Sequence, residues 1–102
     1  MKNVIEKNYY SENKSFMYYL HEENRFNIEA LNDLCEYIRA QKTVDKEACK
    51  KLFFIQIQIL KHIIYHFDSN DMSVIKDLPS EYSNYLDDLQ KSVEAYMEKW
   101  GE

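Results

Sequence analysis

Large apolar side chains recur at every third or fourth position along most of this chain, which is the spacing of one face of an α-helix. The pattern predicts helices over residues 11–22, 27–41 and 82–100, with Asn27 and Ser80 as N-caps. The apolar stripe of the last helix consists of Tyr82, Leu86, Leu89, Val93, Tyr96 and Trp100. Its regularity makes this helix the most secure element in the sequence.

Two residues punctuate the end of the chain. Pro79 ends a short predicted helix, because the residue before a proline is biased away from the α region. Gly101 can supply a left-handed C-cap, so Trp100 is expected to dock on the protein. The apolar residues of the short helix are Met72, Ile75 and Leu78.

The segment 45–67 carries two conflicting patterns. Its isoleucines alternate with glutamines over 55–59, which is typical of a β-strand. A strongly helix-forming start precedes them with no turn residue between, and this favours a helix. The helical stripe is Ala48, Leu52, Ile55, Ile59, Ile63 and Phe67. Further apolar flanks, which indicate a helix packed by neighbours on several sides, are formed by Phe53, Phe54, Ile57, Leu60 and Ile64.

The fold predicted from these elements is a compact all-α bundle of four to five helices, built around a central apolar helix, in a single domain over 1–102. The chain has one glycine and one proline, so glycine-rich phosphate loops and nucleophile elbows are excluded. Cys35 and Cys49 have no disulfide-framework spacing. With no signal peptide and no membrane-spanning segment in the sequence, we expect a soluble cytoplasmic protein.

The charge is uneven along the chain, with a net value of −5. Residues 1–67 carry ten Lys or Arg against nine Asp or Glu, whereas residues 68–102 carry three lysines against nine acids. Nucleic-acid binding draws its affinity from clustered cations, so this distribution disfavours a nucleic-acid partner. It favours a larger basic protein as the partner.

Two groups of residues are candidates for chemistry. His62 and His66 lie four positions apart and share a helix face, so they could hold a metal with Asp68 or Asp71. Two histidines do not make a closed site, and a polar rim on a buried helix is the better interpretation. Cys49 has lysines nearby that would lower its pKa if it were exposed, but no histidine base is placed beside either cysteine. We therefore expect neither a cofactor nor enzymatic activity.

Nine tyrosines exceed what the apolar stripes can absorb. Tyrosines and carboxylates on a rigid surface are a common means of binding a basic protein, because tyrosine supplies contact area and the acids steer the encounter. The predicted contact surface on the last helix is Tyr85, Asp87, Asp88, Glu94 and Glu98. A second candidate region is formed by Tyr9, Tyr10 and Tyr18.

In size, acidity and helical content the chain is similar to the small immunity proteins that bacteria pair with nuclease toxins. The similarity implies an inhibitor that covers the active site of a basic toxin, and no motif carries individual residues across from that class. A phage-type inhibitor of a defence nuclease has the same overall character. A helical homodimer with a structural or assembly role is a further alternative, and a small helical metalloenzyme is the least favoured.

Overall fold

Short polar side chains begin four of the five helices in the described part of the chain. The computed structural model describes residues 2–68 and 74–99. Asn3, Ser15, Asn27 and Asp45 each accept a hydrogen bond from the backbone N–H three residues later, which satisfies a donor left free in the first turn. The helices are α1 (Val4–Tyr9), α2 (Phe16–Glu22), α3 (Ile28–Ala40), α4 (Lys46–Phe67) and α5 (Tyr82–Met97). No strand occurs among the described residues, and the predicted all-α bundle is confirmed.

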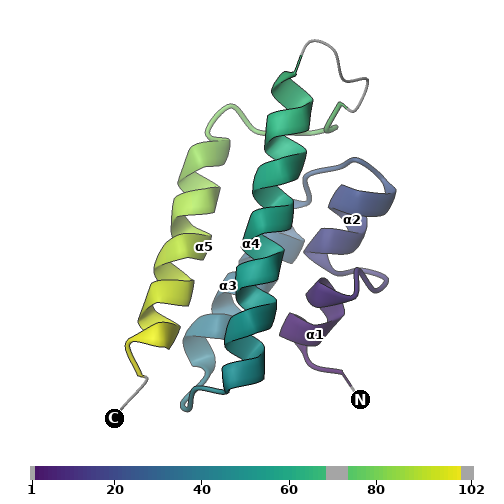
Figure 1. Cartoon of the computed structure of the whole chain (residues 1–102). Helices are drawn as coiled ribbons and strands as arrows, with labels where there is room; N and C mark the ends of the chain where they lie inside the picture. Colours follow the sequence, from purple (N-terminus) through teal and green to yellow (C-terminus); the bar gives the residue numbers. More distant parts are fainter. Residues whose placement is uncertain (1, 69–73, 100–102) are drawn as a thin grey trace.

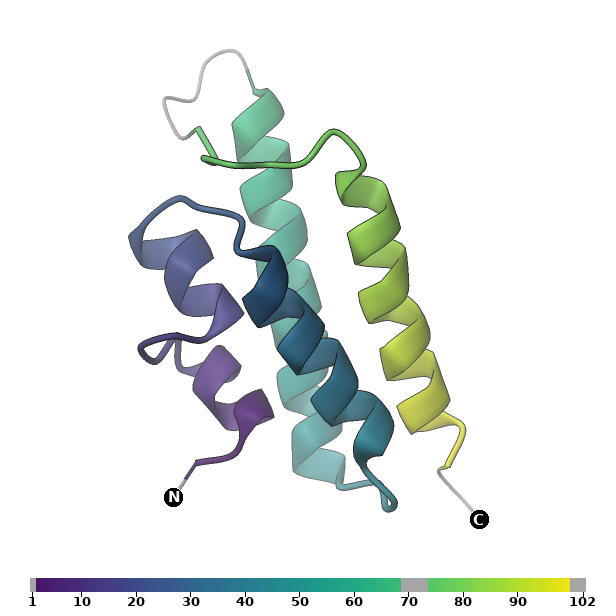
Figure 2. The ribbon, with the colours of Figure 1, turned by 180° about the vertical axis from the view of Figure 1, so that it is seen from behind.

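The three long helices define the bundle. Helix α4 lies in front of α3, with α5 on one side of it and α1 and α2 on the other (Figure 1). The view from behind shows α3 across the back of the molecule, beside α5 (Figure 2). The 45–67 segment is helical, as predicted, despite its alternating isoleucines. Helix α5 packs mainly on α3.

The core lies where these helices face one another. Its fully buried side chains include Phe16, Leu20, Leu31, Leu34, Ile38, Leu52, Ile55 and Ile59. Tyr96 of α5 is also buried, and its hydroxyl accepts a hydrogen bond of 2.8 Å from the backbone N–H of Asp45. That bond joins the end of α5 to the start of α4, and burial raises the pKa of the Tyr96 phenol.

The predicted helix over 11–22 is wrong at its start. The structure has two short helices here, because Ser15 caps α2 and residues 10–15 form a turn. Helix α1 was not predicted, although Asn3 and Glu6 have the spacing of a capping box and make both of its hydrogen bonds. Asn8 secures the turn, since its buried side chain accepts from the backbone N–H of Met17.

The short helix predicted before Pro79 is also wrong in its described part, because residues 74–81 are not helical. Ile75 is buried, and the backbone of Lys76 bonds to Asn24 and Phe26 in the loop between α2 and α3. This pairing uses the donors and acceptors that a helix would need. Helix α5 starts after Glu81 without a side-chain cap, so Ser80 is not its N-cap. Met72, Trp100 and Gly101 lie outside the described residues.

Turns in this nearly glycine-free chain use other residues at positive φ. Ser11, Lys14, Asn24 and Asp77 have φ between 50° and 72°. An L-residue in this region is strained by its Cβ, and asparagine and aspartate tolerate it better than lysine or serine. Three of the four positions flank α2, so the N-terminal turns are made at a conformational cost.

Candidate functional site

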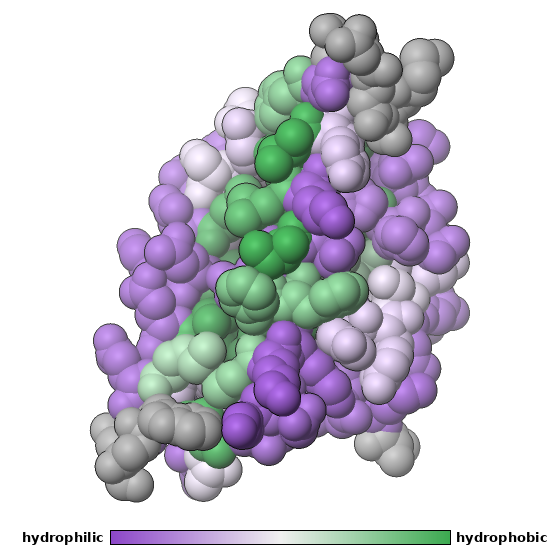
Figure 3. Space-filling view, viewed as in Figure 1, coloured by the Kyte–Doolittle hydropathy of each residue, from purple (hydrophilic) through white to green (hydrophobic). Residues whose placement is uncertain are grey.

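One face of α4 is apolar and exposed. Its residues follow a spacing of four, three, four and three, and we call them the α4 stripe: Phe53, Ile57, Leu60, Ile64 and Phe67. Their exposed fractions range from 40% to 65%. Figure 3 shows this face as a green band along α4 with purple, hydrophilic surface on both sides. We expected neighbours to cover the flanks of this helix, and that prediction is wrong for all five flank residues: Phe53, Phe54, Ile57, Leu60 and Ile64. Phe67 was predicted on the buried stripe and is also exposed.

A second apolar stripe on α4 packs on the core, which explains why the α4 stripe stays exposed. Leu52, Ile55, Ile59 and Ile63 face the core and are buried. Burying this second stripe is sufficient to attach the helix, and the α4 stripe is turned away from it. Phe54 and Tyr65 stand beside the α4 stripe and are also more than two-fifths exposed. An exposed apolar surface of this size typically marks an interaction site.

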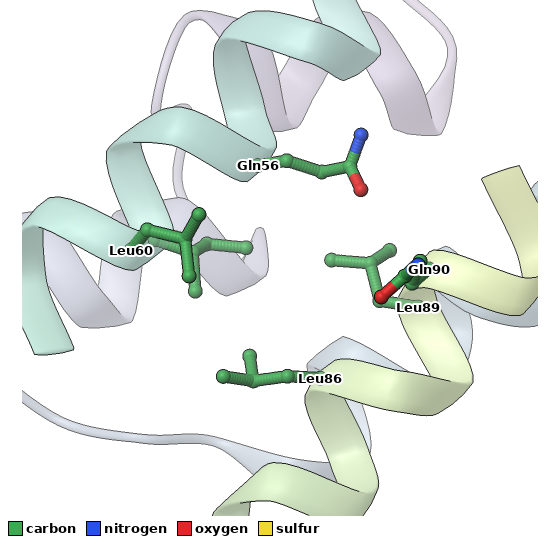
Figure 4. Close-up of a pocket in the computed structure, with 6 residues that line it drawn as sticks. Gln56, Leu60, Leu86, Leu89 and Gln90 are labelled. Carbon is green, nitrogen blue, oxygen red and sulfur yellow. The ribbon is translucent and has the colours of Figure 1, made fainter.

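A shallow groove runs between α4 and α5, next to the α4 stripe. Gln56, Ile59 and Leu60 line it from α4, and Leu86, Leu89 and Gln90 line it from α5. Figure 4 shows the two helices separated here, with Leu60, Leu86 and Leu89 directed into the gap. The groove holds about 100 Å³, well below the roughly 300–1,000 Å³ of small-molecule sites. It therefore fits an apolar side chain of a partner better than a metabolite.

The acidic surface predicted on α5 is only partly present. The Asp88 carboxylate lies 3.1 Å from the Arg39 guanidinium, which also donates a 2.7 Å hydrogen bond to the Ser92 hydroxyl. Asp88 is therefore engaged within the fold. Tyr85 is half-buried, with its ring 6.1 Å from that of Phe26, so it contributes to packing.

The remaining predicted acids stand on the outside of α5. Asp87, Glu94 and Glu98 are exposed, and Glu94 accepts a hydrogen bond from Gln90 of the same helix. Because the opposite side of α5 is packed on α3, these carboxylates sit on a well-supported surface. The structure thus brings together three of the five residues predicted for this helix.

The N-terminal tyrosines mainly attach α1 to α4. The Tyr9 ring lies 4.8 Å from Phe54 and 4.9 Å from Tyr10, and the Lys51 ammonium lies over both tyrosines. Tyr18 is half-buried, so only Tyr10 offers a large exposed ring in this region. The aromatic cluster adds packing and cation–π contacts between the two helices.

The two candidate histidines of α4 contact different partners. His62 faces His21 of α2, with 3.5 Å between Nε2 and Nδ1, and His66 accepts a hydrogen bond from the backbone N–H of Ile75. Burial, and then the neighbouring His21, lower the pKa of His62. Over 2–68 and 74–99, no group of three or more potential ligands could hold a metal ion.

Both cysteines are free thiols within the described chain. Cys35 is buried, and desolvation raises its pKa to about 11. Burial also raises the pKa of Cys49, which is the opposite of the lowering that nearby lysines would cause. Neither thiol has the lowered pKa of an activated nucleophile.

Sequence reasoning missed two parts of this surface. Arg39 lies 49 positions from Asp88, and no local pattern links them; Ser92, four residues after Asp88 on a mostly apolar face, is the one available signal. The exposure of the α4 stripe was missed because periodicity reports apolar faces but not what covers them.

None of the described helices is long and apolar enough to cross a membrane. Comparison with known proteins gives no match to any family model, curated protein or solved structure.

Proposed function

We propose that this protein acts by binding another protein chain and that it is not an enzyme. The α4 stripe carries the proposal. Taking about 200 Å² for each fully exposed side chain, the stripe with Phe54 and Tyr65 exposes roughly 700 Å² of apolar residues. The largest patch on a typical monomer is about 300–600 Å², so this face exceeds what a protein without a partner usually leaves in water.

A second candidate function is inhibition of a larger basic protein, such as a nuclease toxin, in the manner of an immunity protein. The observation that favours it is the exposure of Asp87, Glu94 and Glu98 on a helix whose other side is fixed to α3. Such carboxylates would steer a basic cleft toward α5. Two free cysteines are in keeping with the reducing environment of a cytoplasmic inhibitor.

Site-specific photo-crosslinking in the source cells tests the binding proposal. A photoreactive phenylalanine analogue replaces Ile57 in the α4 stripe, and a matched control carries it at Glu36, an exposed position on α3. We expect a discrete crosslinked protein species from position 57 and none of that mass from position 36. If irradiation gives the same products at both positions, the α4 stripe is not a binding surface and the proposal is wrong.

The inhibitor candidate is tested separately with the product of the neighbouring reading frame. Co-expression of the two proteins should relieve any growth defect caused by that product. The double variant Asp87→Lys, Glu94→Lys should weaken this protection and reduce the salt dependence of association. The control, Glu29→Lys with Glu36→Lys, makes the same charge change on α3. Equal protection by both variants would remove α5 as the contact surface.

A further inference from the structure

We propose that the partner of the α4 stripe is the same stripe in a second copy of this chain, with the two α4 helices antiparallel across a two-fold axis at Leu60. This inference rests on the proposed function, because it uses the same surface. It commits that surface to one occupant, and three properties of the α4 stripe support the choice.

The first property is the symmetry of the α4 stripe. Read from either end, its residues are Phe, Ile, Leu, Ile and Phe. Phe53 and Phe67 each lie seven positions from Leu60, and the isoleucines lie three and four positions from it. An antiparallel pair therefore places Phe53 against the second copy's Phe67, Leu60 against Leu60, and isoleucine against isoleucine. A two-fold interface requires a surface that is complementary to itself in this way.

The second property is the spacing of the α4 stripe. Alternating steps of four and three residues are the a and d positions of a heptad, which form the seam between two helices that pack as a coiled coil. Isoleucine and leucine in the middle of the stripe are the residues that such a seam prefers. The exposed seam is about 21 Å long, from the helical rise of 1.5 Å per residue. A helix of equal length would cover it from Phe53 to Phe67.

The third property is the area. The roughly 700 Å² of apolar residues exposed by the α4 stripe, Phe54 and Tyr65 approaches the ~800 Å² per partner of a standard protein interface. Helix α4 stands at the front of the molecule between α5 and α1 (Figure 1), and the green band lies on the outer surface (Figure 3). A second copy can therefore reach the stripe without moving another helix.

Charge at the start of α4 decides the orientation. Lys46 and Lys50 continue the line of the stripe toward the N-terminus, and both are exposed. A parallel pair would set these lysines beside their counterparts and would align the two helix macrodipoles. Each of these two arrangements is electrostatically unfavourable. The antiparallel pair separates the two lysine-bearing ends. It also leaves Asp87 and Glu94 of α5 exposed in both copies, so the second candidate function is compatible with a dimer.

One residue predicts how the dimer responds to salt. Lys61 follows Leu60 and stands on the flank of the α4 stripe, so the two copies of Lys61 lie near each other across the axis, on the same face of the helix pair. Their repulsion opposes association and is screened by salt. We therefore expect the dimer to tighten severalfold between low and moderate salt. Lys61→Gln should tighten it at low salt and remove most of this dependence, whereas Lys42→Gln, an exposed lysine outside α4, should change neither.

Sedimentation equilibrium of the purified chain gives the first test. We expect a species of twice the 12.4 kDa chain mass, with a dissociation constant in the micromolar range or below. Ile57→Asp with Ile64→Asp should abolish the dimer and keep the helical circular dichroism spectrum, because both side chains are exposed. The control Val74→Asp changes an apolar residue outside α4 that is about as exposed as Ile64, and it should leave the dimer intact.

Cysteine crosslinking tests the orientation in a background carrying Cys35→Ala and Cys49→Ser. Leu60→Cys should form a disulfide with its second copy under mild oxidation, because both thiols lie at the axis. Phe53→Cys alone should not, because two such residues would lie about 21 Å apart along the helices, beyond the reach of a disulfide. A mixture of Phe53→Cys and Phe67→Cys should crosslink between the two variants.

The outcomes separate this inference from the proposed function. A chain that sediments only as a monomer, yet crosslinks through position 57 to a protein of another mass, refutes the dimer and leaves protein binding in place. A monomer with no crosslink specific to position 57 refutes both. A dimer that survives the double aspartate variant refutes the α4 interface. Efficient disulfide formation between two chains that both carry Phe53→Cys refutes the antiparallel arrangement.

Discussion

Replacing Tyr96 with phenylalanine isolates the hydrogen bond that joins α5 to the start of α4. The ring of Tyr96 is buried in the core, and its hydroxyl accepts from the backbone N–H of Asp45 at 2.8 Å. Phenylalanine keeps the ring and removes only the acceptor, so packing should be nearly unchanged. The donor it leaves behind belongs to the N-cap residue of α4.

The size of the effect follows from the position of that donor. A net hydrogen bond contributes about 0.5–1.5 kcal/mol, and a buried donor left without a partner costs about 1–3 kcal/mol. Asp45 itself is exposed, so water can reach its N–H after the substitution and the lower part of the range applies. We expect Tyr96→Phe to lower the free energy of unfolding by about 1–1.5 kcal/mol. In a chain of this size that corresponds to a fall in Tm of roughly 4–10 °C.

The pH dependence provides an independent check on the same residue. Burial raises the pKa of Tyr96 in the folded state, so the folded protein holds this proton more tightly than the unfolded chain. The resulting stability is present below the ordinary tyrosine pKa and is lost as the pH rises through the raised value. Phenylalanine cannot lose a proton, so the gap between the two proteins should narrow above about pH 10.

Urea unfolding followed by circular dichroism at neutral and alkaline pH measures both effects. Tyr65→Phe is the matched control, because Tyr65 is an exposed tyrosine on α4 and should change stability by less than about 0.5 kcal/mol. If Tyr96→Phe is as stable as the wild type at neutral pH, the hydrogen bond to Asp45 contributes nothing. If the gap does not narrow at alkaline pH, the raised pKa of Tyr96 is wrong.

Three further predictions concern other parts of the fold. Lys14→Gly should raise the free energy of unfolding by about 0.5–1 kcal/mol in urea titrations by relieving a positive φ, whereas Lys42→Gly, where φ is not positive, should lower it. Arg39→Met should lower the free energy of unfolding by about 1–2 kcal/mol, because the arginine also bonds to Ser92. Asp88→Asn should lower it by less than about 1 kcal/mol, because the ion pair is half exposed; a larger loss for Asp88→Asn than for Arg39→Met in thermal melts would contradict this. The raised pKa of Cys35 should make stability fall by up to about 2–3 kcal/mol as the pH rises from 9 to 11, and Cys35→Ala should remove that loss in alkaline unfolding curves.

The sequence predicts the helices better than it predicts their surroundings. The long segment 45–67 is helical because its apolar residues keep one continuous face, and the alternation of its isoleucines is too short to compete. The same pattern could not reveal that α5 packs on α3 and leaves Phe53, Ile57 and Leu60 in water. Which face is covered depends on contacts between distant elements, and a periodic pattern carries no information about them.

The errors at the loops have two causes, one local and one that involves residues distant in the sequence. Residues 11–15 are all polar and no glycine or proline separates them from the apolar stripe that begins at Phe16, so the predicted helix starts too early; the caps at Asn3 and Ser15 divide this region into two helices. At 74–81 the backbone of Lys76 pairs with Asn24 and Phe26, about 50 positions away, and this pairing overrides the weak helical pattern. On the candidate surface, the exposure of Asp87 and Glu94 followed from the helical period. The engagement of Asp88 by Arg39 did not, because the guanidinium comes from another helix.

Helices α4 and α5 are held together at both ends and separated between. At one end the rings of Phe67 and Tyr82 lie 5.6 Å apart, and at the other the Tyr96 hydroxyl binds the backbone of Asp45. Leu60 and Leu86 line the open stretch (Figure 4). These two contacts fix the width of the groove before a partner binds. Binding therefore does not include the entropy loss of ordering the two helices. Weakening either end should therefore slow docking and reduce affinity even where the contact residues are untouched.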